Sequence, residues 1–208
     1  MFLRQSGHRC CSHDTRRLVL YFGTPVALVG TAGSHANANI SPVSSLWALG
    51  QTIVLGLGTT GCTLANLRER EECTINLPSA DLWPKVEAIA RTTGSSPVPP
   101  EKTAMGYVHH PDKFALGGFT PVPPETVRAP RIAECPLQLE CRLSALHGDE
   151  SRGFVLVDLT VKRVHAHRDI VVGGTHHIDT SRWHPLFFIF REYFGDARSL
   201  GRNFRAGR

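Results

Sequence analysis

The feature that most limits the fold of this chain is a two-residue alternation in its second half. The apolar or small members of the series are Cys135, Leu137, Leu139, Cys141, Leu143 and Ala145. The residues between them are polar: Gln138, Glu140, Arg142 and Ser144. A period of two places each set on its own face of a strand, so we predict a long antiparallel strand with one face in the core.

A turn at residues 149–153 follows this strand, and the chain then returns with a second apolar series. The members of that series are Val155, Val157, Leu159 and Val161. Two long strands joined in this way form an antiparallel hairpin. Hairpins of this kind are typical of β-barrels, so we expect a mainly β fold.

Four shorter segments upstream also have the composition of strands, at residues 25–30, 37–45, 53–58 and 73–77. Turn-forming residues between Gly33 and Asn37 predict that the first two form a hairpin. A helix of roughly ten residues is expected to end at about Arg70. A second helix, with Ser79 as its N-cap, would place three apolar side chains on one face: Leu82, Val86 and Ile89.

The strand at 53–58 leads directly into the first helix through a glycine- and threonine-rich junction. At a helix start, backbone N–H groups lack intrahelical partners and the helix dipole adds partial positive charge. Hydroxyl donors and small residues surround this start: Gly58, Thr59, Thr60 and Thr63. A phosphate group is a natural occupant of such a junction, so we interpret it as the anion end of a cofactor site.

Small polar residues just upstream, in the segment Asn39–Trp47, can lie close to a planar ligand. Pro42 cannot donate to a β-ladder and therefore marks an edge, a bulge or a strand end. The alternative interpretation is an ordinary strand–loop–strand in which the serines bond to their own backbone. The residues alone leave both interpretations open.

Residues 56–61 also match the G-x-G-x-x-G pattern of dinucleotide-binding folds, and Asp81 lies about 20 residues further on. A doubly wound parallel sheet, however, needs repeated strand–helix crossovers. The sequence supplies none after Arg91, and its second half is antiparallel. A Rossmann-type NAD-binding protein is therefore kept only as an alternative.

Length and charge exclude several classes of function. At 208 residues the chain suits one domain, and no apolar run approaches the roughly 20 residues that cross a bilayer, so no membrane role is expected. The formal charge of +5 comes from dispersed basic residues, apart from a C-terminal arginine cluster that we interpret as a solvated tail. Nucleic-acid binding needs a dense basic stripe or a known module, and the sequence has neither.

The cysteines and histidines do not form a metal motif. Six cysteines occur without any C-x-x-C spacing, and reduced thiols in a cytoplasmic protein fit them best. His165 and His167 share one face of a strand, and His176 and His177 follow in a loop. No cysteine or carboxylate spacing completes a site around them, so we expect no metal and interpret these histidines as solvated or hydrogen-bonded.

Two segments stand apart from the predicted core. Residues 1–17 hold four arginines and show no apolar periodicity, so we expect a disordered N-terminal extension ahead of one domain at residues 18–208. Residues 92–130 are dense in proline and glycine, and segments of this length inside a domain tend to be functional. We expect an ordered arm that Tyr107, Phe114 and Phe119 anchor to the body or to a second subunit.

Seven stretches then occur in a recognisable order: YFGTPVALV (21–29), NISPVSS (39–45), LGLGTTGCTLANL (55–67), CTINLPSADLW (73–83), HPDKF (110–114), PRIAECPLQLE (130–140) and FFIFREYFG (187–195). In this order they resemble the flavin reductase-like, FMN-binding split-barrel family. The resemblance covers nearly the whole chain. Several stretches in order are far more specific than one glycine motif.

The resemblance implies a six-stranded antiparallel Greek-key split barrel of the FMN-binding type with peripheral helices. Such proteins are usually homodimers, with FMN near the subunit interface and NADH or NADPH as the reductant. By position, the isoalloxazine and ribityl groups would meet Asn39, Ser44 and Ser45. The phosphate side would be held by Thr59, Thr60, Thr63 and Asn66. In this family a histidine of the late loop approaches the flavin, and His177 is the candidate here.

We therefore expect an NAD(P)H:flavin oxidoreductase that transfers hydride to FMN and passes electrons to a partner oxygenase or a small acceptor. One departure from the family pattern concerns the phosphate. Many relatives have Lys or Arg two residues before the helix threonine or directly before it, where this chain has Gly61 and Cys62. The phosphate would then lack a charge-assisted partner, which keeps a non-catalytic flavin-binding module as the alternative.

Overall fold

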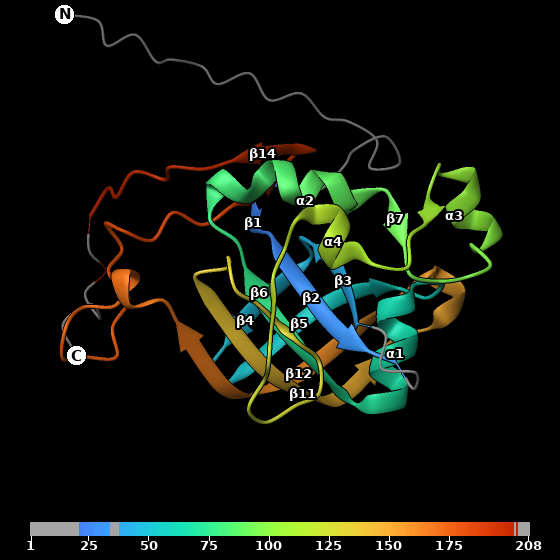
Figure 1. The fold of residues 1–208 in the computed structure, drawn as a ribbon, viewed down its shortest axis with the longest axis horizontal. Coiled ribbons are helices and arrows are strands. Elements are labelled where there is room, and N and C mark those ends of the chain that lie inside the picture. Colours follow the sequence, from blue (N-terminus) through green and yellow to red (C-terminus); the bar gives the residue numbers. More distant parts are fainter. Residues whose placement is uncertain (1–20, 34–37, 202, 204–208) are drawn as a thin grey trace, which may run out of the picture.

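The computed structural model describes residues 21–33, 38–201 and 203. At its centre is one curled antiparallel sheet with the strand order β3-β2-β6-β11-β12-β5-β4 (Figure 1). Its strands are β2 (Ala27–Ala32), β3 (Ala38–Val43), β4 (Leu46–Leu49), β5 (Thr52–Gly58), β6 (Glu72–Leu77), β11 (Leu137–His147) and β12 (Phe154–Ala166). The two edge strands, β3 and β4, are consecutive in the chain, so the sheet curls toward a barrel. The predicted mainly β fold is confirmed.

The sheet contains seven hydrogen-bonded strands where we expected six. The additional strand is β4, a four-residue edge strand that pairs with β5. The sequence LWAL does not alternate between polar and apolar residues, which is why it was not predicted. Ser44 and Ser45 form the bend between β3 and β4, and the Gly56 N–H donates to the Ser45 carbonyl across it. This bend positions both serines beside the end of β5.

Strand β5 pairs antiparallel with both of its neighbours, β12 and β4. The Rossmann alternative requires parallel strands at this place and is therefore wrong. The strand–glycine–helix junction itself is present, since β5 leads into α1 (Cys62–Arg70). The G-x-G-x-x-G pattern in this chain belongs to an antiparallel sheet.

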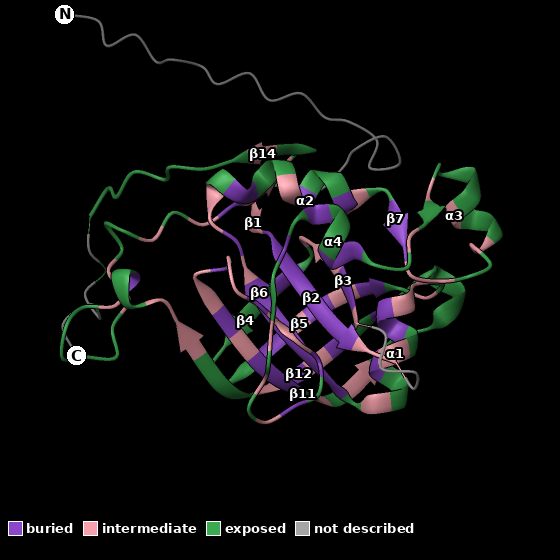
Figure 2. Ribbon diagram, in the orientation of Figure 1, coloured by how far each residue is buried: buried purple, intermediate pink, exposed green. Residues whose placement is uncertain are grey.

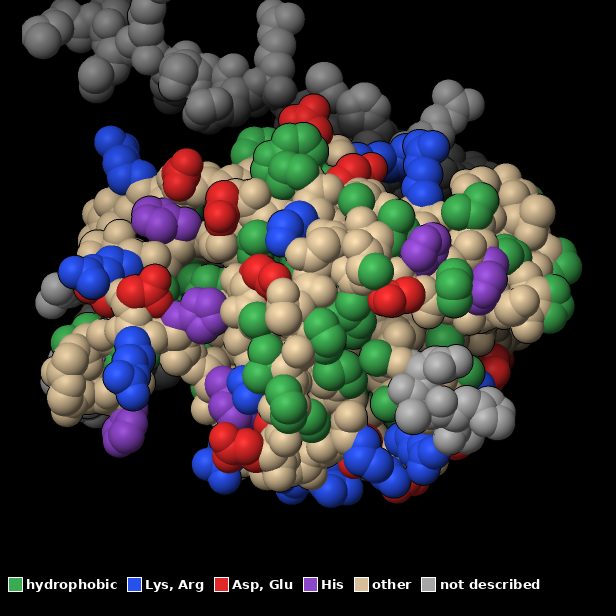
Figure 3. Space-filling model, viewed as in Figure 1, with side chains coloured by type: hydrophobic (Ala, Val, Ile, Leu, Met, Phe, Trp, Pro, Cys, Tyr) green, Lys and Arg blue, Asp and Glu red, His purple; other side chains and the backbone are tan. Residues whose placement is uncertain are grey.

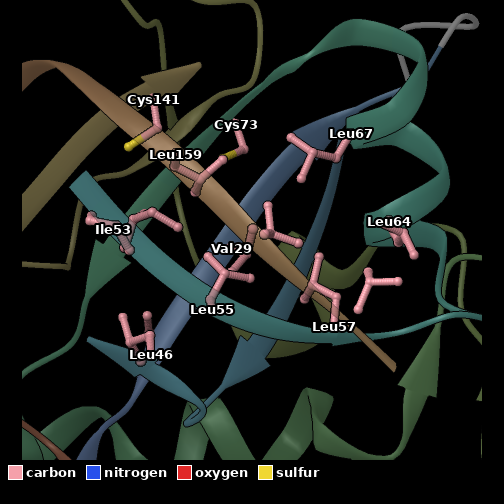
Figure 4. Close-up of a cluster of buried hydrophobic side chains, with 14 residues drawn as sticks. Val29, Leu46, Ile53, Leu55, Leu57, Leu64, Leu67, Cys73, Cys141 and Leu159 are labelled. Atoms are coloured by element: carbon pink, nitrogen blue, oxygen red, sulfur yellow. The ribbon is translucent and has the colours of Figure 1, made fainter. Parts of the chain in front are cut away.

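The larger of two clusters of buried side chains lies inside the curled sheet, and Figure 2 shows burial along its strands. Figure 4 shows side chains of β2, β5, β12 and α1 converging there, among them Val29, Leu55, Leu57, Leu159, Leu64 and Leu67. Burying one such side chain contributes roughly 1.5–3 kcal/mol. A nine-residue helix is only marginally stable alone. The core contacts of Leu64 and Leu67 therefore hold α1 against the sheet.

A second apolar cluster lies between the sheet and a layer of short helices. The helical segments η2 (Ala80–Leu82) and α2 (Trp83–Ala90) bury Leu82, Val86 and Ile89, as the helical spacing predicted. Ser79 precedes this helix as predicted, but its hydroxyl bonds to Asp81 and caps no backbone N–H. The other short elements of the second half are η3 (Glu150–Arg152), η4 (Arg168–Ile170), β13 (Phe187–Ile189) and β14 (Glu192–Phe194). Strand β13 pairs with β1 (Thr24–Pro25).

The proline-rich segment at residues 92–130 is the ordered arm that we expected. Its elements are β7 (Thr92–Thr93), α3 (Pro100–Ala104), β8 (Val108–His109), α4 (Lys113–Gly117) and β9 (Pro121–Val122), after which β10 (Arg131–Ile132) pairs with β9. Phe114 and Phe119 are buried in the second cluster and anchor the arm to the body. Tyr107 is half-buried and lies against Lys102 instead.

The arm also explains a feature of β11 that the sequence did not predict. Two residues of the polar face of that strand, Gln138 and Glu140, are buried. Residues 123–130 cross this face, and the Glu140 carboxylate accepts hydrogen bonds from two arm N–H groups, the Thr126 hydroxyl and His165. Burial by itself acts to raise the pKa of Glu140, but these bonds outweigh it and lower the pKa to about 2. The alternation holds as far as Leu143; a register shift follows, and Leu146 rather than Ala145 packs against the core. The alternation could not reveal what covers the polar face.

Replacing Glu140 with alanine is expected to lower the free energy of unfolding by about 3 kcal/mol at pH 7, because four donors lose their acceptor. Its pKa is lower in the folded state than in the unfolded state, so this stabilisation is present above about pH 4.5 and is lost as pH falls toward 2. Urea denaturation at pH 7 and pH 3 measures both effects. The control is Glu134→Ala, because Glu134 is more accessible than Glu140 and its hydrogen bonds to the arm go to Thr120. This control should lower the free energy of unfolding by about 1 kcal/mol. Equal losses in the two variants would contradict this account.

The structure also bears on the expectations about histidines, metal sites, membrane spans and basic surface. His165 and His167 are hydrogen-bonded, to Glu140 and to the Ala133 carbonyl. Among the described residues no group of three or more potential ligands could hold a metal ion, and no helix there is long and apolar enough to cross a membrane. On the face drawn in Figure 3, the Lys and Arg side chains lie in several groups with acidic residues between them. The expected disordered extension at residues 1–17 lies outside the described residues.

Candidate functional site

A polar cleft of about 590 Å³ lies where β5 leads into α1. One wall is the β3–β4 bend at residues 41–45, and the floor is the junction at residues 56–61 together with Thr63. The arm supplies the opposite wall with Lys102, Met105 and Tyr107. Three segments that are far apart in the sequence therefore meet around one opening.

The start of α1 faces this cleft without a cap of its own. Gly61 is the N-cap residue, with φ −87° and ψ 140°, and it has no side chain that can accept from the first N–H groups. The first turn carries no acidic residue. The N–H groups at Cys62 and Thr63 thus have no intrahelical partner and no side-chain cap. The dipole of the helix makes this position favourable for an anion.

Buried side chains behind the cleft form a connected series of hydrogen bonds. Asn39 donates to the Thr63 hydroxyl at 3.2 Å, and that hydroxyl donates to Ser41 Oγ at 2.9 Å. Lys113 Nζ donates to the same Ser41 oxygen at 3.3 Å and to the Ile40 carbonyl at 3.0 Å. The Oδ1 atom of Asn39 is buried and has no partner among the described residues. Thr63 is therefore fixed in orientation, and an acceptor beside it is unused.

Two lysines make the site electropositive. Lys113 is 2% exposed, and burial lowers its pKa to about 8. Burial also lowers the pKa of Lys102, which is only half-buried. The ionisable groups that act on these ammonium groups are each other and Cys62, and no carboxylate is among them in the part of the chain that the structure describes. A bound anion would compensate this charge.

Cys62 lies at the first position of α1, between the two lysines. Burial raises the pKa of its thiol, although both lysines and Asn66 act in the opposite direction. The thiol is therefore protonated at neutral pH and carries no charge into the site. Its sulfur packs close to Gly94, where a Cβ atom would approach the sulfur to 3.0 Å and Asn39 Oδ1 to 2.9 Å. Glycine at this position lets the arm approach the start of α1.

The structure brings together most of the residues predicted to hold a cofactor. Those that line the cleft are Ser44, Ser45, Gly58, Thr59, Thr60 and Thr63. Asn39 lies behind the cleft wall, bonded to Thr63. Asn66 lies one turn along α1, where its amide donates to Thr31. Within one chain, Asn66 therefore stabilises the packing of α1 on β2.

His177 is not near this cleft within the chain. Its backbone N–H donates to the Thr175 hydroxyl oxygen, in an exposed loop between η4 and β13. In Figure 1 this loop lies at the left of the molecule, whereas α1 and α3 lie at the right. A role for His177 in the cleft therefore requires a second copy of the chain, and it stays a prediction.

Two further cavities bear on the assignment. One of about 390 Å³ adjoins the cleft, since Tyr21, Ser45 and residues 56–58 line both. Its other walls are apolar: Trp47, Val54, Phe154 and Leu156. A larger cavity of about 900 Å³ lies beneath β14, with Trp83 and Tyr193 among its lining residues. The helical start that lines the larger cavity, at Ser79 and Ala80, carries an acidic residue, Asp81, in its first turn. The cleft at α1 is therefore the better candidate for an anionic nucleotide.

Comparison with known proteins places this site in a family. A family model described as a flavin reductase like domain matches residues 19–195. The chain belongs to the flavin reductase-like family. The family predicted from the ordered stretches is therefore confirmed, together with its split-barrel fold. As a member, the chain is a flavin-related oxidoreductase with a flavin cofactor.

Individual proteins also resemble this chain in sequence or in structure. The Bacillus subtilis (strain 168) protein named "Uncharacterized protein YdfE" is 38% identical over 200 residues, which cover 93% of this chain and 96% of that one. Flavoredoxin of Desulfovibrio vulgaris (Miyazaki F) has a similar structure, with a TM-score of 0.76, 23% identity and coverage of 95% and 100%. Nitrilotriacetate monooxygenase component B from Bacillus cereus is also similar in structure, with a TM-score of 0.74 and 16% sequence identity. The match covers 94% of this chain and 100% of that one. These two structures share the fold of this chain.

Sequence reasoning missed two residues of the site, Lys102 and Lys113. Lys113 was inside the HPDKF stretch that carried the resemblance, but no property of the stretch itself indicated that the lysine would be buried behind Ser41. Lys102 lies in the arm about 40 positions after Gly61 along the sequence, with no periodicity around it. Only the path of the arm brings Lys102 to the start of α1.

Proposed function

We propose that this protein binds FMN in the cleft at the start of α1 and transfers hydride from NADH or NADPH to the flavin. The observation that carries the proposal is the uncapped start of α1, which faces the cleft near two lysines, neither of which forms an ion pair with a carboxylate among the described residues. The polar lining of the cleft also fits a nucleotide. A bound flavin supplies the hydride-accepting ring.

The residues of the chain then have separate roles. The N–H groups at the start of α1 and the hydroxyls of Thr59 and Thr60 bind the phosphate. Thr63 is held by Asn39 and Ser41, so its orientation is set before the ligand arrives. Ser44 and Ser45 line the cleft, and Ser45 also lines the adjoining apolar cavity, which is the proposed place of the ring. The chain thus orients the flavin rather than donating a proton.

The ring side of this site opens on the outer face of β4, β5 and β12. Trp47 and Leu156 line the adjoining cavity and remain 57% and 45% exposed. Large exposed apolar side chains on neighbouring strands mark an interaction surface, and we propose that a second copy of the chain covers them as a two-fold homodimer. The partner copy would also be the source of a histidine such as His177 near the ring.

The proposed electron acceptor is an oxygenase, by analogy with a protein of similar structure. One protein with a similar structure is titled a monooxygenase component B, which supports a role in supplying reduced flavin to an oxygenase. A small acceptor would fit the same chemistry. We place the protein in the cytoplasm because Cys62, Cys73, Cys135 and Cys141 are free thiols.

The second candidate function is a flavin-binding module without turnover. The observation that favours it is the composition of the cleft, where the ionisable side chains are Glu101, Lys102, Tyr107 and Glu150 together with Tyr21. Glu150 forms an ion pair with Arg68. None of the five side chains is oriented by a second described residue to act as a general acid. Hydride transfer to a flavin does not require such a group, so oxidation of NAD(P)H decides between the two functions.

The test is a titration of the purified protein with FMN, followed by a turnover assay. We expect a perturbation of the visible flavin bands and oxidation of NADH or NADPH faster than by free FMN. Binding of FMN without faster oxidation would favour the second candidate. An unperturbed spectrum would contradict both functions.

The pH dependence of FMN binding tests the part of the site formed by Lys113. Its pKa of about 8 means that the ammonium form predominates at pH 7 and is mostly lost by pH 9. If the bound phosphate favours the ammonium form, the dissociation constant for FMN should rise about tenfold between these pH values. In Lys113→Met, which keeps the apolar stem, the dissociation constant should be higher and independent of pH.

The stability of the ligand-free protein should change in the opposite direction. Between about pH 8 and 10.5 the unfolded chain binds the Lys113 proton more tightly than the folded protein does, so folding stability attributable to this group rises with pH. Weaker FMN binding at pH 9 would therefore not result from unfolding. A pH-independent dissociation constant in the unchanged protein would contradict the role of Lys113.

A further inference from the structure

Lys102 lies on α3, a short helix that the arm places beside the start of α1. Its ammonium nitrogen is 3.7 Å from the point that a Cβ atom of Gly61 would occupy. The same nitrogen lies 5.2 Å from the centre of the Tyr107 ring, in cation–π contact. The side chain is half-buried, so its position is restricted on two sides. A cation is thus held directly at the uncapped helix start.

The charges around Lys102 leave it available to an anion. The ionisable group that acts on it is the Cys62 thiol, which is neutral at pH 7. Two carboxylates line the same cleft, at Glu101 and Glu150. Glu150 is already paired with Arg68. Glu101, on the same short helix, is exposed to solvent.

Gly61 and Cys62 lack the basic side chain that would give a phosphate its charge-assisted partner from α1 itself. We propose that Lys102 supplies this partner from the arm and thereby selects phosphorylated flavin, FMN, over riboflavin. The inference rests on the proposed function and adds to it the residue that determines ligand specificity. A small residue at 61 and a lysine at 102 are complementary, since a side chain at 61 would occupy the space in front of the ammonium group.

The contacts of the arm support a fixed rather than an incidental position for Lys102. Gly94 packs directly against Cys62 and Asn39, and the His110 N–H donates to the Thr93 carbonyl at 2.9 Å. The Tyr107 N–H donates to the Lys102 carbonyl, which closes the turn after α3. The His110 bond thus closes the two ends of this segment on each other, and the contacts of Gly94 hold the closed end against β3 and α1. The lysine reaches the helix start because the arm is held there.

The test compares two ligands that differ only in the phosphate. Dissociation constants for FMN and riboflavin are measured by flavin fluorescence for the unchanged protein, Lys102→Met, Lys102→Arg and Lys162→Met. We expect Lys102→Met to weaken FMN binding by roughly tenfold to hundredfold and to leave riboflavin binding unchanged. Lys102→Arg should retain most of the preference, and Lys162→Met is the matched control because Lys162 is exposed on β12.

A second readout uses ionic strength. Removing one phosphate contact should make the FMN dissociation constant of Lys102→Met less dependent on salt than that of the unchanged protein. If Lys102→Met binds FMN and riboflavin with the ratio of the unchanged protein, the inference is wrong while the proposed function stands. If the unchanged protein binds neither flavin, the proposed function is wrong and the inference fails with it.

Discussion

Replacing Gly61 with aspartate is expected to weaken FMN binding at least a hundredfold without loss of folding stability. The new carboxylate would cap α1 and lie close to Lys102, at the place proposed for the phosphate. Two unit charges about 4 Å apart near a protein surface repel by about 4 kcal/mol, close to a thousandfold in affinity. The variant also removes the free N–H groups from the site, since an N-cap aspartate accepts from them.

The backbone at Gly61 tolerates this change. Its φ and ψ lie in the extended region that N-cap residues with side chains adopt, and a Cβ atom would meet its nearest neighbour, the Gly58 carbonyl oxygen, at 3.4 Å. An N-cap aspartate is favoured over glycine by a few tenths of a kcal/mol, so the melting temperature should stay the same or rise slightly. The matched control is Gly61→Asn, which has the same shape without the charge. If Gly61→Asp keeps its full affinity for FMN, the phosphate does not bind at the start of α1.

Replacing Leu156 with glutamate is expected to convert the proposed homodimer into a monomer. Leu156 belongs to an apolar surface on three adjacent strands of the sheet, and the register pairs β12 with β5 and β5 with β4. The members of this surface, all more than 40% exposed, are Trp47, Leu49, Phe154 and Leu156. In a two-fold interface each residue occurs twice, so one substitution removes two buried leucines. At roughly 2 kcal/mol each, the dimer weakens by about a thousandfold.

Native mass spectrometry of the unchanged protein and the variant measures this effect. Leu200→Glu is the matched control, because Leu200 is 87% exposed and lies outside the apolar surface. We expect a dimer for the unchanged protein and for Leu200→Glu, and a monomer for Leu156→Glu. A dimeric Leu156→Glu protein would show that another face forms the interface. A monomeric unchanged protein would contradict the homodimer itself.

Local patterns in the sequence predicted the parts of the fold that depend on neighbouring residues. The alternation in β11 and β12 and the helical spacing of Leu82, Val86 and Ile89 each state which side chains share a face. The structure packs these faces against the apolar clusters, in β11 as far as the register shift after Leu143. The same patterns do not state what covers the other face. Glu140 therefore seemed to be a surface residue, although the arm crosses it and supplies its hydrogen-bond donors.

The candidate site divides in the same way. Residues of the junction between β5 and α1 are close in sequence, so a glycine- and threonine-rich run was enough to place Thr59, Thr60 and Thr63 together. Lys102 reaches the site through the arm, and no local rule predicts where a proline-rich segment of that length will pass. The missing basic residue at the start of α1 was visible in the sequence. The cation that stands in its place required the structure.

The central claim is that the start of α1 binds the phosphate of a flavin mononucleotide. A crystal structure of the protein with FMN tests it most directly. The account predicts phosphate oxygens within hydrogen-bond distance of the Cys62 and Thr63 N–H groups, with the Lys102 ammonium group beside them. FMN bound instead in the cavity that Trp83 and Tyr193 line would contradict it.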